Sequence, residues 1–217
     1  APAQQAVTAD PSLGDFTTTG GEVLPDARLR YRVFGDPALG RERGWTLVFH
    51  ALTDSHEVDR WWGPLFEHGA PLDPTYRPVL AANLLGSCYG STGPSPESRS
   101  PALPFPRLTT TDLARAHTPL LAHLGVERVA LATGGSLGGM VALEWAREAP
   151  VPTDRVVVFA APEAIRMERR GIERGAPERP CQRRSNPGPR LGGPRALRLA
   201  RHGIDPAGSP RPRRGAP

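Results

Sequence analysis

Lysine is absent from the chain, so all 27 basic residues among its 217 residues are arginine. Cysteine is scarce, and the two residues present, Cys88 and Cys181, are too few to build a disulfide framework. No run approaches the roughly 18 uninterrupted apolar residues that a transmembrane helix needs. Residues 1–14 also lack the basic patch and apolar run of a secretory signal. We therefore expect a cytoplasmic protein without a membrane segment.

Charge is divided unevenly along the chain. Residues 1–165 hold 13 arginines and 18 acidic residues, a net charge of −5, whereas residues 166–217 hold 14 arginines and 4 acidic residues, a net charge of +10. The second segment has no valine and no aromatic residue, so it buries too little apolar surface to offset the entropy of ordering. We expect a flexible N-terminus at 1–14, a folded domain at 15–163 and a disordered, Arg/Pro/Gly-rich tail at 164–217.

The expected domain alternates strand patterns with helix patterns. An alternating apolar pattern predicts a half-buried antiparallel strand over 29–34, and short apolar runs predict strands buried on both faces. These runs lie at 45–49, 78–82, 128–132 and 155–161. Helical spacing predicts helices over 112–124 and 137–147. The order predicts an α/β fold with a doubly wound, mostly parallel sheet.

The first of these helices carries its own boundary signals. Thr110 or Thr111 is expected to cap its start, and Gly125 is expected to end it. Pro119 lacks a backbone N–H and fixes its own φ, so it predicts a kink or a late start.

A nucleophile elbow is the strongest local signal. Gly134-Gly135-Ser136-Leu137-Gly138 has the pattern G-x-S-x-G and lies between a predicted strand and a predicted helix. A serine on such a turn has strained backbone angles and close chain neighbours, which glycines at 134 and 138 permit. The start of the helix presents free N–H groups to a developing oxyanion. The alternative is a glycine-rich turn that holds an incidental serine.

The segment His50-Ala51-Leu52-Thr53 directly follows the strand predicted at 45–49. In an α/β-hydrolase this loop supplies the second oxyanion N–H, here the backbone N–H of Leu52, beside that of Leu137. For His50 the alternative is a packing or capping role at the strand end.

Several motifs together resemble the homoserine O-acetyltransferase family, in order and over about residues 15–163. They are His50-Ala51-Leu52-Thr53-Asp54-Ser55-His56, Trp61-Trp62, Asn83-Leu84-Leu85-Gly86-Ser87-Cys88-Tyr89-Gly90-Ser91-Thr92-Gly93-Pro94, Gly134 to Met140, and Ala142-Leu143-Glu144-Trp145-Ala146. Two departures are visible: a glycine usual after the first-motif threonine is absent at Thr53-Asp54, and Leu137 replaces the usual methionine.

The resemblance implies an α/β-hydrolase fold and an acyltransferase of methionine biosynthesis. It implies that Ser136 takes an acyl group from acyl-CoA, acetyl-CoA first, and passes it to the hydroxyl of homoserine. Acetyl-CoA is then a substrate and no permanent cofactor or metal is expected. The donor (acetyl or succinyl), the acceptor (homoserine or serine) and the oligomeric state, a homodimer included, stay open.

A catalytic Asp and His are missing from the pattern. In this fold they follow the serine in chain order, which excludes His56, His68, His117 and His123. Downstream stand only His202, with Asp154 and Asp205, and none fits a strand end in the right order. No triad Asp or His is therefore identified in this chain.

The family-like sequence stops near Pro162, and the residues beyond it have the composition of out-of-frame GC-rich DNA. Met167-Glu168 must be encoded ATG-GAA or ATG-GAG, and the next frame reads TGG, a tryptophan that the family carries after its Ala-Pro-Glu. We hypothesise a frameshift between about Pro162 and Met167, so that C-terminal strands and lid are missing and the chain as written is inactive.

Two other functions compete with acyl transfer. A generic esterase of the same fold would lack the 83–94 motif. Nucleic-acid binding through the arginine-rich tail is disfavoured because the tail has no aromatic side chains to stack on bases.

Overall fold

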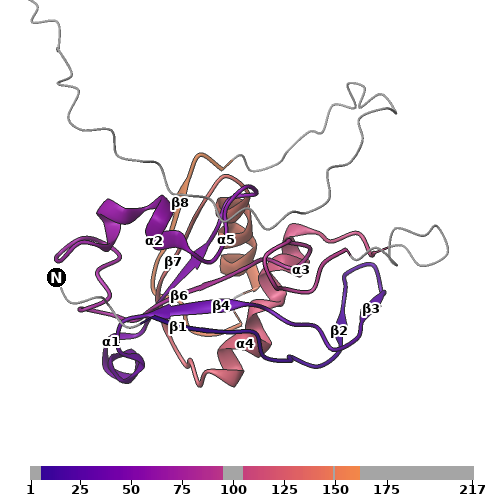
Figure 1. The fold of residues 1–217 in the computed structure, drawn as a ribbon, viewed down its shortest axis with the longest axis horizontal. Coiled ribbons are helices and arrows are strands. Elements are labelled where there is room, and N and C mark those ends of the chain that lie inside the picture. Colours follow the sequence, from indigo (N-terminus) through magenta and orange to yellow (C-terminus); the bar gives the residue numbers. More distant parts are fainter. Residues whose placement is uncertain (1–5, 95–104, 149, 162–217) are drawn as a thin grey trace, which may run out of the picture. The chain divides into compact units, whose positions relative to one another are not determined.

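A mixed sheet of six strands forms the centre of the domain (Figure 1). The computed structural model describes residues 6–94, 105–148 and 150–161. The strand order is β1-β4-β6-β5-β7-β8, with β4 (Tyr31–Phe34) antiparallel to both of its neighbours. The remaining neighbours, β6 (Val79–Ala82), β5 (Trp45–Phe49), β7 (Val129–Gly135) and β8 (Val156–Phe159), run parallel. The predicted α/β fold with a mostly parallel sheet is confirmed.

Part of the N-terminal segment at 1–14 is paired with the sheet. Residues Ala6–Ala9 form β1, which pairs antiparallel with β4 so that Ala6 lies opposite Phe34. Ser12 forms a further antiparallel bridge with Arg28. Without β1, the side of β4 that faces away from β6 would leave its backbone N–H and C=O groups unpaired. The short extended segment at 6–9 pairs with them. A separate hairpin comes next, made of β2 (Phe16–Thr17) and β3 (Val23–Leu24).

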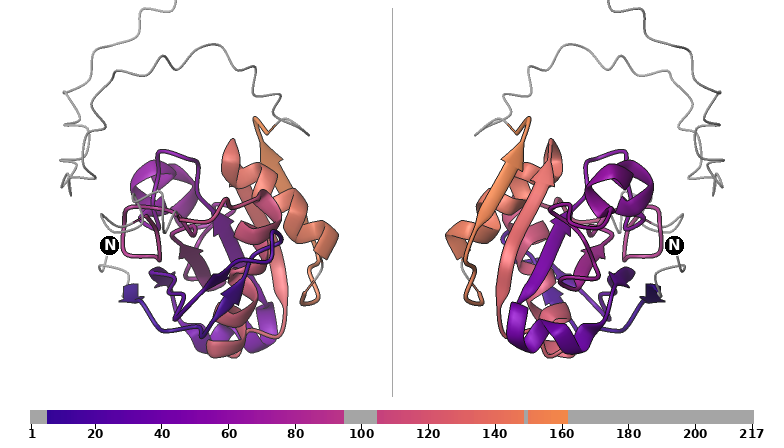
Figure 2. Two further views of the ribbon diagram at one scale, coloured as in Figure 1. Left: turned by 90° about the vertical axis from the view of Figure 1, so that its right-hand side faces the viewer. Right: turned by 90° about the vertical axis from the view of Figure 1, so that its left-hand side faces the viewer.

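Helices cover both faces of the sheet (Figure 2). On one face, α3 (Thr110–Arg115), α4 (His117–His123) and α5 (Leu137–Glu148) pack their apolar residues against β5 and β7. On the other face, α2 (Val58–Trp61) and the 3₁₀ turn η2 (Gly63–Phe66) pack against Phe34, Val48 and Val79. The 3₁₀ turn η1 (Pro37–Leu39) and α1 (Gly40–Arg43) lead into β5. Strand β5 is buried along its whole length, as its apolar run predicts.

The helix expected over 112–124 is two helices. The break lies at Ala116, so Pro119 occupies the first turn of α4, where its missing N–H has no helical partner to lose. The predicted end at Gly125 is confirmed by its φ of +63°. The predicted cap is one or two residues too late. Thr109 is the N-cap and forms a capping box with Asp112, because the Asp112 carboxylate reaches back to the Thr109 N–H.

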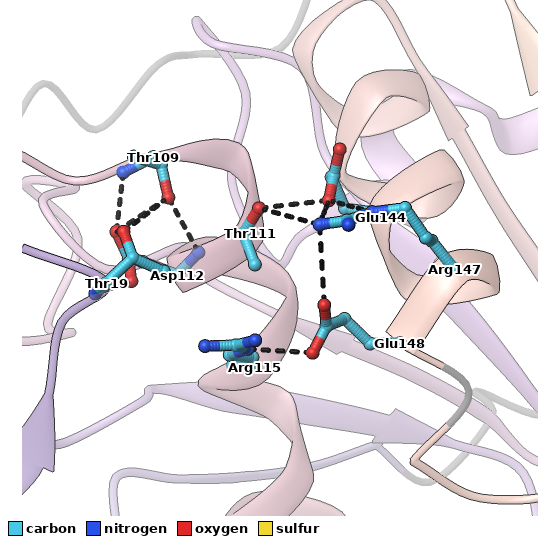
Figure 3. Close-up of polar contacts among 8 residues, drawn as sticks. All are labelled: Thr19, Thr109, Thr111, Asp112, Arg115, Glu144, Arg147 and Glu148. Carbon is cyan, nitrogen blue, oxygen red and sulfur yellow. Dashed lines mark hydrogen bonds and ion pairs between the residues drawn. The ribbon is translucent and has the colours of Figure 1, made fainter.

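Buried Asp112 also joins the hairpin to the helix layer (Figure 3). Its carboxylate accepts hydrogen bonds from the N–H and hydroxyl of Thr19, at 2.6 and 3.0 Å, and from those of Thr109, at 2.8 and 2.7 Å. Burial alone would raise the pKa of Asp112, but these bonds outweigh it and hold the pKa below its ordinary value. The anion therefore fixes the β2–β3 turn to the start of α3.

Helix α5 is fastened to α3 by a second polar group (Figure 3). The Thr111 hydroxyl donates to Glu144 over 2.9 Å, and the Arg115 guanidinium donates to Glu148 over 2.8 Å. Arg147 bonds Glu144 from the same helix. Each exposed pair stabilises by only about 0–1 kcal/mol, so the apolar contacts beneath them decide where α5 lies.

Strand β8 is the outermost described strand on its side of the sheet. Its predicted burial on both faces is wrong, because burial alternates and Val157 and Phe159 are 41% and 50% exposed. Val156 and Val158 pack toward the helices on the other face. Among the described residues, Val156–Phe159 thus forms one edge of the sheet. The tail predicted at 164–217, and the frameshift region, lie outside them.

Candidate active site

Ser136 stands on the turn between β7 and α5, as predicted. Its φ is +52°, a left-handed conformation that a residue with a side chain rarely adopts, and the residue is exposed. The backbone N–H of Ser136 donates to the Phe159 carbonyl over 3.0 Å, and its carbonyl accepts the Met140 N–H over 3.2 Å. Strand β8 and the first turn of α5 therefore hold the strained residue from both sides.

The two elbow glycines are required by backbone contacts. A Cβ on Gly134 would lie 2.3 Å from the carbonyl carbon and oxygen of Gly138. A Cβ on Gly138 would lie 2.0 Å from the Phe49 carbonyl oxygen and 2.7 Å from that of His50. No side chain fits between these chain segments. The predicted role of both glycines is thus explained by the close approach of β5, β7 and α5.

The two residues predicted to supply oxyanion N–H groups line one cavity. Leu52 and Leu137 both face a cavity of about 260 Å³, whose other walls come mainly from Leu84–Tyr89 and Leu113. Leu52 is 77% exposed. The loop closes although a glycine is missing after Thr53, because the Asp54 N–H donates to the Ala51 carbonyl over 3.0 Å.

His50 has a structural role in this loop. The ring is buried; its Nδ1 donates to the Ala51 carbonyl over 2.7 Å and its Nε2 accepts the Leu84 N–H over 3.0 Å. Burial lowers the pKa of His50, so the ring stays neutral near pH 7. With both nitrogens engaged, His50 joins the ends of β5 and β6, which is the strand-capping alternative.

The other described histidines are placed as helix or loop residues, as expected. His56 bonds Asn83, and exposed His68 pairs with Asp73 over 3.1 Å. His123 lies exposed at the end of α4, and His117 is buried, with Nδ1 donating to the Leu113 carbonyl. Among the described residues, no histidine follows Ser136 in the sequence. His202 and Asp205 lie outside them, and Asp154 pairs with Arg128.

Asn83 is an organising residue of the site that was not predicted from the sequence. It is fully buried at the end of β6, and its side chain bonds both His56 and the Tyr89 carbonyl. Its place in a family-like motif was the only signal. Asp54 also lines the cavity, and burial raises the pKa of its carboxyl. Cys88 is exposed at the cavity wall.

Comparison with known proteins decides the family. Residues 45–176 match the family described as alpha/beta hydrolase fold, which is more than half of the chain. The chain belongs to the α/β-hydrolase fold family. Within this family, a homoserine O-acetyltransferase of Thermus thermophilus is 44% identical over 174 residues, which cover 69% of this chain and 45% of the relative. The predicted resemblance is thereby confirmed.

Two further relatives of this α/β-hydrolase show the same partial match. A homoserine O-succinyltransferase of Nocardioides is 38% identical and covers 76% of this chain and 48% of the relative. The crystal structure of homoserine O-acetyltransferase from Staphylococcus aureus matches with a TM-score of 0.61 and 30% identity, over 72% of this chain and 47% of that one. The chain spans about half the length of the relatives it matches.

Two other kinds of site are not found in the described part of the chain. It contains no helix that is both long and apolar enough to cross a membrane. Within the same residues, His, Cys, Asp and Glu side chains nowhere gather in a group of three that could hold a metal ion.

Proposed function

We propose that this chain carries the nucleophilic half of an acyltransferase. Ser136 accepts an acyl group from acyl-CoA, acetyl-CoA first, as an ester, and the hydroxyl of homoserine then takes the acyl group from the ester. The bond broken in the first step is the thioester, and CoA leaves as the thiol. The observation that carries the proposal is the strained, exposed Ser136 held between the α5 N-terminus and β8.

The arrangement of N–H groups supports this chemistry. In the first turn of a helix the N–H groups have no intrahelical partner, so the Leu137 N–H at the start of α5 is available to a ligand. The Leu52 loop faces the same cavity as Leu137. Two such donors stabilise the negative charge on the tetrahedral intermediate, and losing one typically costs about 10²–10³ in turnover.

Among the described residues, no histidine follows Ser136 to accept its proton. Ser136 keeps the basicity of an alcohol unless a histidine removes its proton, and losing triad members costs on the order of 10⁴–10⁶ in turnover. We therefore expect the 217-residue chain to turn over very slowly unless it is given a base in solution. Small imidazole can reach Ser136 because the residue is exposed.

The test is chemical rescue followed by mass spectrometry. The 217-residue protein is incubated with acetyl-CoA with and without imidazole, digested, and measured for an acetyl group on the Ser136 peptide. We expect imidazole-dependent acetylation that Ser136→Ala abolishes, and added homoserine should remove the label as O-acetylhomoserine. Equal labelling in Ser136→Ala, or no labelling with imidazole, would overturn the proposal.

The alternative of a plain esterase predicts a different pattern. It would release nitrophenol from p-nitrophenyl acetate through Ser136 but would lose its acetyl group to water at the same rate with and without homoserine. Succinyl-CoA run in parallel decides the donor, because one of the similar relatives is named a succinyltransferase. Nucleotide sequencing past codon 160 decides whether the coding frame shifts there.

A further inference from the structure

One buried amide at the end of β6, that of Asn83, bonds both His56, which follows the Leu52 loop, and Tyr89, which lines the cavity shared by Leu52 and Leu137. The Asn83 side-chain oxygen accepts the His56 N–H over 2.7 Å and the His56 ring Nδ1–H over 3.1 Å. Its side-chain nitrogen donates to the Tyr89 carbonyl over 2.5 Å. The Asn83 backbone carbonyl accepts the Ser91 hydroxyl over 2.7 Å, and its N–H donates to the Arg30 carbonyl over 2.8 Å. All the hydrogen-bonding groups of this residue except one amide proton and a lone pair are thereby used.

These bonds act on the loop that carries the Leu52 N–H. The loop begins at His50, whose Nε2 accepts the Leu84 N–H over 3.0 Å, and ends at His56, which bonds Asn83. Neighbouring residues 83 and 84 therefore hold both ends of one loop. Between the ends, the bond from the Asp54 N–H to the Ala51 carbonyl closes a single turn, so the orientation of the Leu52 N–H depends on how the ends are anchored.

We propose that Asn83 is a positioning residue, which fixes the Leu52 oxyanion donor and the Tyr89 side of the cavity in one geometry. The inference rests on the proposed acyl transfer at Ser136. An amide suits the position because it offers an acceptor to His56 and a donor to Tyr89 at the same time. A carboxylate would keep the acceptor but would face the Tyr89 carbonyl with a second acceptor, and alanine would lose both.

The test compares Asn83→Ala and Asn83→Asp with the wild type in the imidazole-rescued acetylation of Ser136. Asn83→Ala should lower the maximal acetylation rate by at least about tenfold, because a misplaced oxyanion donor loses most of its effect. The acetyl-CoA concentration giving half-maximal rate should change less than twofold. Amide exchange at residues 51–55 should become faster in the same variant.

Asn83→Asp adds a pH dependence of the acetylation rate, which a merely structural role of Asn83 would not produce. Burial raises the pKa of the introduced carboxyl, and the protonated acid again offers both an acceptor and a donor. The ratio of variant rate to wild-type rate, each corrected for folded fraction, should therefore rise as the pH falls from 8 toward 5. Taking the ratio cancels the protonation of imidazole itself.

Asp73→Ala is the matched control. Asp73 is also buried and accepts three hydrogen bonds, from the Gly69 N–H and from the N–H and hydroxyl of Thr75, in a loop before β6. It should lose stability but keep the acetylation rate of its folded fraction. Equal rates in Asn83→Ala and wild type, or an equal rate loss in Asp73→Ala, would overturn the positioning role.

The two proposals fail in different ways. If wild-type Ser136 takes no acetyl group, the proposed function fails, and amide exchange at 51–55 alone decides whether Asn83 orders the loop. If the wild type is acetylated and Asn83→Ala shows neither a slower rate nor faster exchange, only the inference about Asn83 is wrong.

Discussion

Replacing Gly138 by alanine would place a methyl group where no space exists. Its carbon would lie 2.0 Å from the Phe49 carbonyl oxygen and 2.7 Å from that of His50. Both neighbours are backbone atoms of the sheet's central region, so neither can move aside by a change of rotamer. Alanine inside a helix ordinarily stabilises by about 1 kcal/mol relative to glycine. Overpacking that forces backbone shifts costs about 1–3 kcal/mol, and more when the neighbours are rigid.

We expect the steric cost to exceed the helix preference, for a net loss of about 2 kcal/mol. For a domain of this size, that lowers the melting temperature by roughly 4–8 °C. Urea unfolding followed by the fluorescence of buried Trp145 on α5 measures the loss. Gly63→Ala is the control, because its Cβ would have no atom within 4 Å and its φ is not left-handed. It should change stability by less than about 0.5 kcal/mol. If Gly138→Ala were as stable as Gly63→Ala, the elbow glycines would not be held by packing.

Two further predictions concern buried ionisable groups. Asp112→Ala leaves hydrogen-bond donors of Thr19 and Thr109 unpaired. We expect the free energy of unfolding, measured with urea, to fall by about 2–3 kcal/mol. An unchanged urea midpoint would show that the carboxylate does not hold the β2–β3 hairpin. Burial lowers the pKa of His117 to about 4 from its ordinary 6.5. Between about pH 6.5 and pH 4, His117 is protonated in the unfolded chain but not in the folded chain. The free energy of unfolding should therefore decrease as the pH falls from about 6.5 toward 4. The total decrease in the free energy of unfolding is about 3 kcal/mol. In His117→Gln, the free energy of unfolding should depend less on pH over this range. An equally steep dependence in the variant would show that another group causes the loss of stability in acid.

Much of the fold could be predicted from local patterns. The apolar run at 45–49 coincides with β5. The glycine spacing around Ser136 indicated the turn, because a strained backbone with close neighbours selects glycine at defined positions. Strand β1 could not be predicted, since four residues with two alanines carry little β preference of their own. Its partner is β4, more than twenty residues away, and pairing at that distance leaves no local signal.

The site divides in the same way. The meeting of Leu52 and Leu137 at one cavity could be predicted, because it depends on position in a motif and not on side-chain identity. The hydrogen bonds of Asn83 could not be predicted, because its partners at positions 56 and 89 approach it only once β5 and β6 lie side by side. The capping residue was misplaced for a related reason: Thr109, Thr110 and Thr111 are equivalent in sequence, and only the reach of Asp112 distinguishes them.

The backbone contacts of the elbow have a consequence for reading genomes. Gly134 and Gly138 are required for α5 to lie on the sheet at all, so a chain that had lost its catalytic histidine would still be under pressure to keep both glycines in order to fold. The serine between them carries no such constraint beyond tolerating a left-handed angle. In degenerate copies of such genes, the glycines should therefore persist longer than the serine. The G-x-S-x-G pattern then indicates the fold, whereas activity has to be judged from the serine together with a catalytic histidine and carboxylate elsewhere in the chain.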